Sequence, residues 1–509
     1  MFSKVYSAAI HGIDGLIVSV EADVSDGLPV FDMVGLLGSE VKEARERVKI
    51  AIKNSGYRLP AKRITVNLSP ADIRKEGTAF DLPVAIAILT AFGYIDQERL
   101  KDILIIGELS LNGTVNSVNG VLPIVLSAME QGFKKCLIPV GNVNEGAVVS
   151  GIETYGISSL SETVEILNGI KSVLPVKSDT SKLLSNTSKD KLDFSEVVGQ
   201  KVAKRAIEIA VSGMHNILMI GPPGSGKTML AKRIPTIMPE LSFKESVEIS
   251  KIYSIAGLLD NQALILSRPF RAPHHTITAT ALTGGGSKPR PGEISLAHLG
   301  VLFLDELPEF DKNTIEILRQ PMEERYVTIA RLSGTYQYPA GFMVVGAMNP
   351  CQCGYFPDRN ICGCSINQVK RYLGKISRPL LDRFDICVEA LQMNYMELRE
   401  QPTEESSEEI RKRVRLAREI QLDRYKGYNI FFNSELTPST IKKYCQLGSK
   451  EQSLLEQAFI KMNLSARAYH RILKVARTIA DLEQSDKIKV KHLSEAICYR
   501  SLDNKYWGE

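Results

Sequence analysis

The sequence has little of several features that mark whole classes of protein. None of its apolar runs approaches the length of a membrane span, so we expect no transmembrane helix. The opening residues, MFSKVYSAAIHGIDG, lack the sustained apolar stretch of a secretory signal, and we therefore expect a cytoplasmic protein. Disulfides are not expected in that reducing compartment. The net charge is only +5, which permits a nucleic-acid partner without indicating one.

What is present is the composition of a globular protein, with 44% hydrophobic and 24% charged residues among 509, too many for one ordinary domain. Residues 1–170 alternate β-rich runs with helical patterns, which predicts an α/β or α+β domain. Residues 171–193 are rich in Lys, Ser, Asp and Thr and are predicted to be a linker. An α/β pattern returns over 194–395, and residues 396–509 are predicted to be helical.

A phosphate-binding motif, GPPGSGKT, occupies residues 221–228 between an apolar strand and a helix. Its glycines let backbone N–H groups surround phosphate oxygens, and the helix N-terminus favours an anion. The lysine is predicted to reach the β- and γ-phosphates of ATP, and the threonine to ligate Mg²⁺. The predicted nucleotide-binding residues are Gly221, Pro222, Pro223, Gly224, Ser225, Gly226, Lys227 and Thr228.

Two later apolar strands are predicted to complete the site. The run GVLFLDELPEF (300–310) delivers Asp305 and Glu306 to a strand end, where ligands bind in open α/β sheets. We expect Asp305 to hold Mg²⁺ and Glu306 to act as general base toward water. Asn349 ends the run GFMVVGAMNP (341–350) and can orient that water, although an ordinary strand-ending turn explains it equally well.

Two arginines are candidates for a site shared between subunits. Arg383 precedes another apolar strand in RPLLDRFDICVEA, and Arg467 begins a helix in LSARAYHRILKVA. An arginine that enters a nucleotide site from a neighbour contributes about 10³–10⁵ in rate. For either arginine taken alone, a surface salt bridge is the commoner explanation.

These stretches together resemble the ComM/YifB competence-protein family, a magnesium-chelatase-like branch of the AAA+ ATPases. The matching segments include GPPGSGKTMLAKRIP, FRAPHHTITATALTGGGSKPRPGEISLAHLGVLFLDELPEF and YPAGFMVVGAMNPCQCGY. The resemblance implies a ring-forming ATPase, a hexamer, linked to DNA branch migration in natural transformation. It also implies that Asn349 is the sensor-1 residue, Arg383 the arginine finger and Arg467 the sensor-2 arginine of a helical lid domain. In the family pattern an asparagine stands where this chain has Leu299.

The N-terminal domain resembles the Lon protease domain, which raises a rival function. RKEGTAFDLPVAIAIL (74–89) is similar to the segment that carries the Lon serine, and Ala79 stands at that position. Leu122 stands at the position of the paired lysine. A Ser–Lys protease needs a hydroxyl nucleophile beside an amine base, so the resemblance implies a retained fold without peptidase chemistry.

Three functions therefore compete: a DNA motor, a metal-chelatase or protein-remodelling motor, and an ATP-dependent protease. Residues that can meet DNA phosphates are Lys288 and Arg290 in the glycine-rich loop TGGGSKPRPGE, and Arg331 near the turn of a predicted hairpin (325–340). No base-reading signature is evident, so we expect DNA binding that is independent of sequence. The basic run RKRVRLARE (411–419) is typical of a solvated helix face. We assign no metal to His274 or His275, and their role stays open.

The loop NPCQCGYFPDRNICGCS (349–365) holds half of the eight cysteines. Four thiolates suit a closed tetrahedral zinc site, although C-x-C is tighter than the usual ligand spacing. The competing interpretation is a packed or redox-sensitive loop without metal. Disulfides are disfavoured by the compartment, and no base is paired with a cysteine for catalysis. The candidate zinc ligands are Cys351, Cys353, Cys362 and Cys364.

Overall fold

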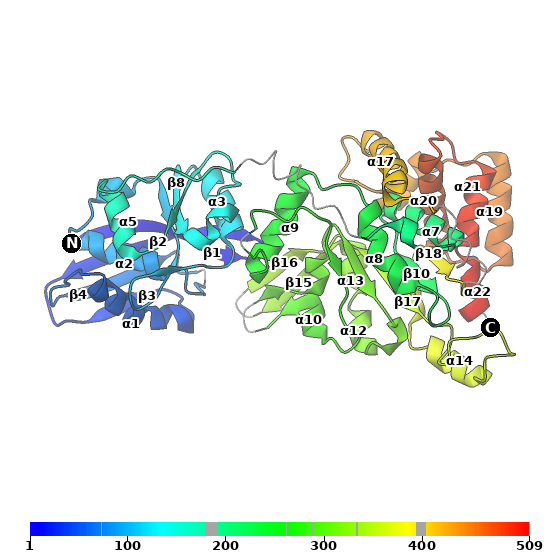
Figure 1. Ribbon diagram of the computed structural model, residues 1–509, viewed down its shortest axis with the longest axis horizontal. Helices are drawn as coiled ribbons and strands as arrows, with labels where there is room; N and C mark the ends of the chain where they lie inside the picture. Colours follow the sequence, from blue (N-terminus) through cyan, green and yellow to red (C-terminus); the bar gives the residue numbers. More distant parts are fainter. Residues whose placement is uncertain are drawn as a thin grey trace. The chain divides into compact units, whose positions relative to one another are not determined.

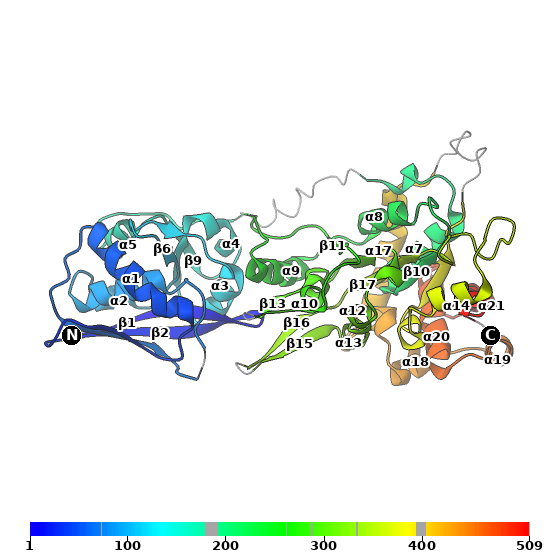
Figure 2. The same ribbon diagram turned by 90° about the horizontal axis from the view of Figure 1, so that it is seen from below.

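The computed structural model of the chain describes residues 1–72, 74–178, 192–260, 262–286, 289–331, 334–392 and 404–507. The chain forms two compact units, each discontinuous in sequence (Figures 1 and 2). The first comprises Met1–Thr187, Ser242–Leu266 and Thr328–Tyr338, and the second comprises the remaining residues. The expected linker, 171–193, falls largely outside the described residues. Within the described ranges, no helix is both long and apolar enough to cross a lipid bilayer.

The first unit is built on a mixed seven-stranded sheet with strand order β3-β4-β2-β1-β5-β8-β9. Strands β1, β2 and β4 pair antiparallel, whereas β1, β5, β8 and β9 pair in parallel. The strands are β1 Phe2–His11, β2 Asp14–Ser25, β3 Phe31–Val34, β4 Arg63–Ser69, β5 Ile103–Ile105, β8 Lys135–Pro139 and β9 Glu153–Ile157, with a separate ribbon β6 Glu108–Leu109 and β7 Val115–Asn116. Its helices are α1 Ser39–Asn54, α2 Asp81–Ala91, α3 Val121–Glu130, α4 Val143–Gly146, α5 Leu160–Leu167 and α9 Phe243–Ala256.

Both faces of this sheet are covered, as the alternation along β5 shows. Ile103 and Ile105 point into one apolar cluster with α2 and α5, while Leu104 points into another cluster with α3. Since successive strand residues face opposite sides, the two clusters lie on opposite faces. Helix α9 packs against α3, so a segment from the middle of the chain completes the second cluster. Of the two Lon-like positions, Ala79 lies just before α2, and Leu122 is buried in the first turn of α3.

The second unit contains a five-stranded parallel sheet with order β11-β14-β17-β10-β18. Its strands are β10 Ile217–Ile220, β11 Phe270–Arg271, β14 Val301–Leu304, β17 Met343–Met348 and β18 Ile386–Glu389. Strands β10, β14 and β17 are entirely buried, because apolar side chains project from both of their faces. The strand after which the phosphate loop follows, β10, lies between β17 and β18, so the loop opens beside the ends of both neighbours.

Helices and one hairpin accompany this sheet in the second unit. The helices are α7 Lys201–Gly213, α8 Lys227–Ile237, α10 Ala279–Thr283, α11 Glu293–Leu296, α12 Lys312–Glu316, α13 Arg319–Glu324, α14 Ile366–Leu373 and α15 Arg378–Leu381. The hairpin pairs β12 Gly284–Gly285 with β13 Arg290–Pro291. Another hairpin, β15 Tyr326–Arg331 with β16 Gly334–Pro339, lies mostly in the segment Thr328–Tyr338 of the first unit. The C-terminal region is helical, as expected, with α17 Ser407–Arg424, α18 Pro438–Tyr444, α19 Ser449–Lys461, α20 Ala466–Leu482, α21 Val490–Cys498 and α22 Ser501–Trp507.

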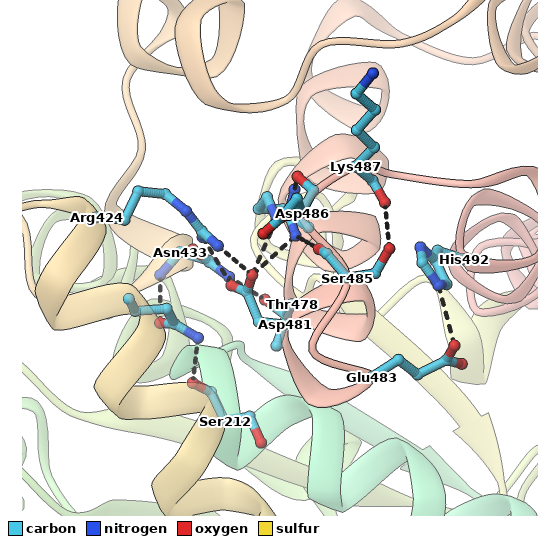
Figure 3. Close-up of polar contacts among 12 residues, drawn as sticks. Ser212, Arg424, Asn433, Thr478, Asp481, Glu483, Ser485, Asp486, Lys487 and His492 are labelled. Atoms are coloured by element: carbon cyan, nitrogen blue, oxygen red, sulfur yellow. Dashed lines mark hydrogen bonds and ion pairs between the residues drawn. The ribbon is translucent and has the colours of Figure 1, made fainter.

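A buried polar network fastens the C-terminal helices together (Figure 3). The Asp481 carboxylate on α20 accepts hydrogen bonds from Arg424 on α17 (Nη1–Oδ2 2.8 Å), Arg477 (Nε–Oδ1 3.1 Å) and Asn433 (Nδ2–Oδ2 2.8 Å). Several donors on one fully buried carboxylate offset its desolvation. This network orients α20, which carries Arg467 in its first turn.

The network continues to the sheet through His215. Its Nε2 lies 2.8 Å from Thr478 Oγ1 on α20, and its Nδ1 lies 3.2 Å from Asp385 Oδ2 just before β18. Burial opposes ionisation of Asp385, but the His215 hydrogen bond and the charge of Arg471 hold its pKa below the ordinary value. Through His215, the C-terminal helix α20 is thus connected to Asp385, two residues after Arg383.

Candidate nucleotide site

The phosphate loop has a backbone that its glycines permit. Gly224 and Gly226 have φ of +73° and +82°, in the left-handed region that side chains disfavour. A Cβ on Gly221 would collide with the carbonyl of Ala390 at the end of β18. Helix α8 begins at Lys227, so its unpaired N–H groups and its dipole face the loop. The segment therefore forms a cradle for an anion.

Lys227 lies at the centre of this cradle. Its ammonium donates to the carbonyl oxygens of Gly221 (2.8 Å) and Pro222 (2.9 Å), and to Asn349 Oδ1 (3.2 Å). Burial lowers the pKa of Lys227 to about 8, an effect that the nearby charge of Asp305 only partly opposes. The contact with Asn349 joins β17 to the loop that follows β10, as the parallel sheet order requires.

Thr228 and Asp305 face each other across the same edge of the sheet. The Thr228 hydroxyl donates to Asp305 Oδ2 at 2.7 Å, although the two residues lie 77 positions apart. A hydroxyl and a carboxylate are oxygen ligands of the kind that Mg²⁺ prefers when it also binds phosphates. The pair has the ligand types for a magnesium site, in which these two side chains would hold the ion.

Glu306 has a strained, left-handed backbone conformation. Its φ of 50° and ψ of 46° are left-handed, and this turn ends the run of β14 and exposes the side chain. The Asp305 carboxylate braces the turn by accepting a hydrogen bond from the Glu306 N–H (3.0 Å). The Glu306 side chain is 60% exposed, so its carboxylate is accessible to water.

His275, to which the sequence assigned no role, is a neighbour of Glu306. Its Nδ1 lies 3.5 Å from Glu306 Oε2. The approach follows from the sheet, because β11 and β14 are parallel neighbours and His275 follows β11 by four residues. The contact could be predicted only from the adjacency of those two strands, which the spacing of residues in the sequence does not reveal.

The two candidate arginines lie together at a different place in the second unit. Arg383 and Arg467 both line a cavity of about 590 Å³, along with Arg471 and Lys474, and none of residues 221–228 lines it. Arg383 is nearly buried, and its guanidinium is held by Glu323 (2.8 Å) and by the Arg319 carbonyl (3.0 Å). The structure thus brings together the phosphate loop, Asp305, Glu306 and Asn349, and separately gathers the arginines.

The four cysteines form a compact group after β17. Their Sγ atoms all lie within 4.8 Å of one another, and Cys351 and Cys362 are buried. All four are free thiols, with Sγ–Sγ distances of 3.3 Å for Cys351–Cys353, 3.5 Å for Cys353–Cys362 and 3.8 Å for Cys351–Cys362. Such a group has the ligand types and spacing to hold a metal ion.

Comparison with known proteins adds the decisive observation. Residues 193–398 match the family described as magnesium chelatase, subunit ChlI, while 20–142 match subunit ChlI of Mg-chelatase and 404–500 match its C-terminal family. The chain is 43% identical over 501 residues to the competence protein ComM of Haemophilus influenzae, which covers 98% of this chain and 97% of that protein. This chain belongs to the ComM/YifB family of magnesium-chelatase-like AAA+ proteins.

The chain is also similar to other proteins of this family and to more distant relatives. The Escherichia coli protein YifB is 42% identical over 504 residues and matches along 97% of its own length. The magnesium-chelatase subunit ChlI of Guillardia theta is 25% identical over 240 residues, or 42% of this chain. Membership of the ComM/YifB family confirms the mixed α/β architecture expected from the sequence and indicates an ATP-binding AAA+ protein.

Proposed function

We propose that this chain is an ATP-driven, ring-forming motor that acts on DNA, a branch-migration helicase linked to natural transformation. The observation that carries the DNA function is the 43% identity, over nearly the whole of both chains, to a competence protein. The ATPase part is supported by the geometry around Lys227, Thr228 and Asp305. The proposed ring is a hexamer in the cytoplasm.

In this proposal ATP lies with its phosphates on the loop 221–228. Lys227 contacts the β- and γ-phosphates, Thr228 and Asp305 hold Mg²⁺, and Asn349 orients the attacking water. Mg²⁺ neutralises charge that develops on the phosphate oxygens. Glu306 accepts the proton of the water as it attacks. Release of Lys227 from its carbonyl partners toward the phosphates is favourable, because two negative groups replace neutral acceptors.

Arg383 and Arg467 act, in the same proposal, on the nucleotide of a neighbouring subunit. The support is their common cavity, which the phosphate loop of their own chain does not line. The ion pair with Glu323 and the contacts with carbonyl oxygens hold the Arg383 guanidinium in place before the neighbour arrives. Such preorganisation lowers the entropic cost of transition-state contacts.

The cofactors in this proposal are ATP, Mg²⁺ and one structural zinc ion on Cys351, Cys353, Cys362 and Cys364. The zinc is supported by four free thiols whose sulfur atoms already lie within 4.8 Å of one another.

ATP hydrolysis measured with single-stranded, duplex and forked DNA tests the proposed function. We expect stimulation by at least one of the three, most strongly by the structure that the motor moves along. Hydrolysis that none of them stimulates would contradict a DNA motor. It would favour the alternative, a magnesium-chelatase-type or protein-remodelling ATPase, which the matches to ChlI support.

A further inference from the structure

The loop between β17 and α14 carries the four cysteines and also contacts the nucleotide site. Around a tetrahedral zinc with Zn–S bonds of about 2.3 Å, the sulfurs lie about 3.8 Å apart. The observed distances of 3.3, 3.5 and 3.8 Å come close to that arrangement. They are far longer than a disulfide bond of about 2.05 Å.

The loop backbone is also arranged to support a thiolate. Cys351 Sγ accepts hydrogen bonds from the N–H groups of Gly354 (3.3 Å) and Phe356 (3.4 Å). Donors directed at a ligand sulfur stabilise its negative charge and fix its orientation toward a metal. Arg359 braces the second pair by donating to the Cys364 carbonyl (2.7 Å).

Two contacts connect this loop with the phosphate loop. At its start, Asn349 Oδ1 accepts from Lys227. Further along, Gly354 presses against Pro223, such that a Cβ on Gly354 would lie 2.8 Å from Pro223 Cγ. Gly354 has a φ of +92° and is held there by the Cys351 carbonyl (3.0 Å) as well as by the Cys351 sulfur. A residue that binds directly to the cysteine group thus forms one wall of the phosphate loop.

We infer that the zinc-held loop supports the phosphate loop through Gly354 and Pro223, so that nucleotide affinity depends on zinc occupancy. This inference rests on the zinc of the proposed function and adds a control over the ATP site. Without the ion, the four sulfurs are no longer held together by a common metal centre, and the Cys351 sulfur that accepts the Gly354 N–H is less firmly fixed. The phosphate loop then loses its wall and its preorganised shape, which weakens binding.

The first measurement combines metal analysis with nucleotide binding on the full chain, purified under reducing conditions. We expect near one zinc per chain, and loss of zinc in Cys351→Ser/Cys364→Ser. A zinc-selective chelator, used with Mg²⁺ in excess, is expected to raise the Kd for a fluorescent ATP analogue about tenfold, which corresponds to about 1.4 kcal/mol. Added zinc is expected to restore the affinity.

A second set of variants tests the contact with zinc in place. Gly354→Ala is expected to weaken nucleotide binding while keeping its zinc. The matched control is Gly363→Ala in the second cysteine pair, where an added Cβ meets nothing within 4 Å and binding is expected to stay unchanged. Pro223→Ala removes the ring atoms that the new methyl group would strike. Combined with Gly354→Ala it should therefore recover part of the affinity, which backbone strain alone would not allow.

The outcomes separate the possible failures. A preparation that neither contains zinc nor takes it up would overturn both the zinc site and the inference. Zinc-bound protein whose Kd is unaffected by zinc removal would overturn the inference and leave the zinc site standing. Because nucleotide binding is measured without DNA, a failure of the DNA-motor proposal is detected only in the separate hydrolysis experiment.

Discussion

At the residue scale, the proposed function gives two adjacent carboxylates of the candidate nucleotide site different roles. Asp305 faces Thr228 and also accepts the Glu306 N–H, while Glu306 turns away in a left-handed conformation. The two side chains cannot exchange roles, because only Asp305 lies within hydrogen-bonding distance of the threonine hydroxyl. Substitutions at these residues are therefore expected to have separable effects.

Glu306→Gln is expected to bind ATP with near-normal affinity and to hydrolyse it at least about 100-fold more slowly. The amide keeps the shape of the side chain but cannot take the proton of water, and general-base catalysis is worth about 10²–10⁴ in rate. Lys227→Ala is the matched contrast, since it removes the ammonium that meets the phosphates and should weaken binding itself. Turnover is followed by phosphate release, and binding by a fluorescent ATP analogue. Near-normal turnover in Glu306→Gln would refute the assignment of the base.

Many residues of this site could be predicted from the sequence because their chemistry is local. The phosphate loop, Asp305 and Glu306 stand out by motif and by the apolar strands before them. The contact of His275 with Glu306 depends on strand adjacency, which spacing does not encode. Leu299 adopts a φ of 55°, a conformation that asparagine tolerates better than leucine. The sequence shows that Leu299 departs from the family pattern. It does not show the left-handed backbone conformation that explains why the family usually has asparagine there.

At the element scale, two hairpins carry the described cations proposed to meet DNA. Arg290 lies on β13 and Arg331 at the end of β15, and both are exposed. Lys288 lies outside the described residues. An exposed arginine on a short hairpin can neutralise a phosphate without reading a base, which fits a motor that moves along any sequence.

Reversing the three charges, Lys288→Glu, Arg290→Glu and Arg331→Glu, is expected to abolish DNA-stimulated hydrolysis and to spare basal hydrolysis. Each lost phosphate contact also flattens the dependence of affinity on salt. A matched control reverses three cations that are at least 61% exposed on or beside α17, namely Lys412, Arg415 and Lys426. We expect that control to bind DNA normally. Unchanged affinity in the hairpin variant, measured by fluorescence anisotropy across a salt series, would remove the hairpins from the proposal.

The helices and strands themselves were largely predictable, whereas the surfaces against which they pack were not. Apolar runs located β10, β14 and β17, and helical periodicity located α17 and α20. The packing of α9 on α3 joins residues more than a hundred positions apart, and an apolar helix face does not identify the surface that will cover it. For the same reason the sequence did not show that Ser242–Leu266 and Thr328–Tyr338 belong with the N-terminal sheet.

At the scale of the whole molecule, the separation of the arginine cavity from the phosphate loop is an argument for assembly. A ring of identical subunits related by rotation brings the same two surfaces together at every interface. One surface would present the loop 221–228, and the other would present Arg383 and Arg467. Each nucleotide site would then be completed by arginines from the next copy of the chain.

Mixing Arg383→Ala subunits with Glu306→Gln subunits tests this arrangement. Each parent is expected to be nearly inactive, because every interface lacks one group. Mixed rings contain some interfaces at which an intact Arg383 meets an intact Glu306, and these should restore part of the hydrolysis. The rate is measured across mixing ratios, with subunit exchange followed by energy transfer between labelled chains. If labelled subunits exchange and no mixture exceeds its parents, Arg383 is not an arginine finger acting in trans.

The discontinuous first unit has a consequence for how the polypeptide is made. When residue 187 has just emerged from the ribosome, the whole N-terminal sheet has emerged, but none of Ser242–Leu266 or Thr328–Tyr338 has. Leu264, which is buried in the cluster formed with α3, is still unsynthesised at that moment. The side of α3 that α9 and Leu264 cover in the folded unit therefore stays uncovered while more than seventy further codons are read, which favours aggregation during that interval. An N-terminal fragment that ends at residue 187 would lack these covering residues permanently, and would be a poor substitute for the first unit as it exists in the intact chain.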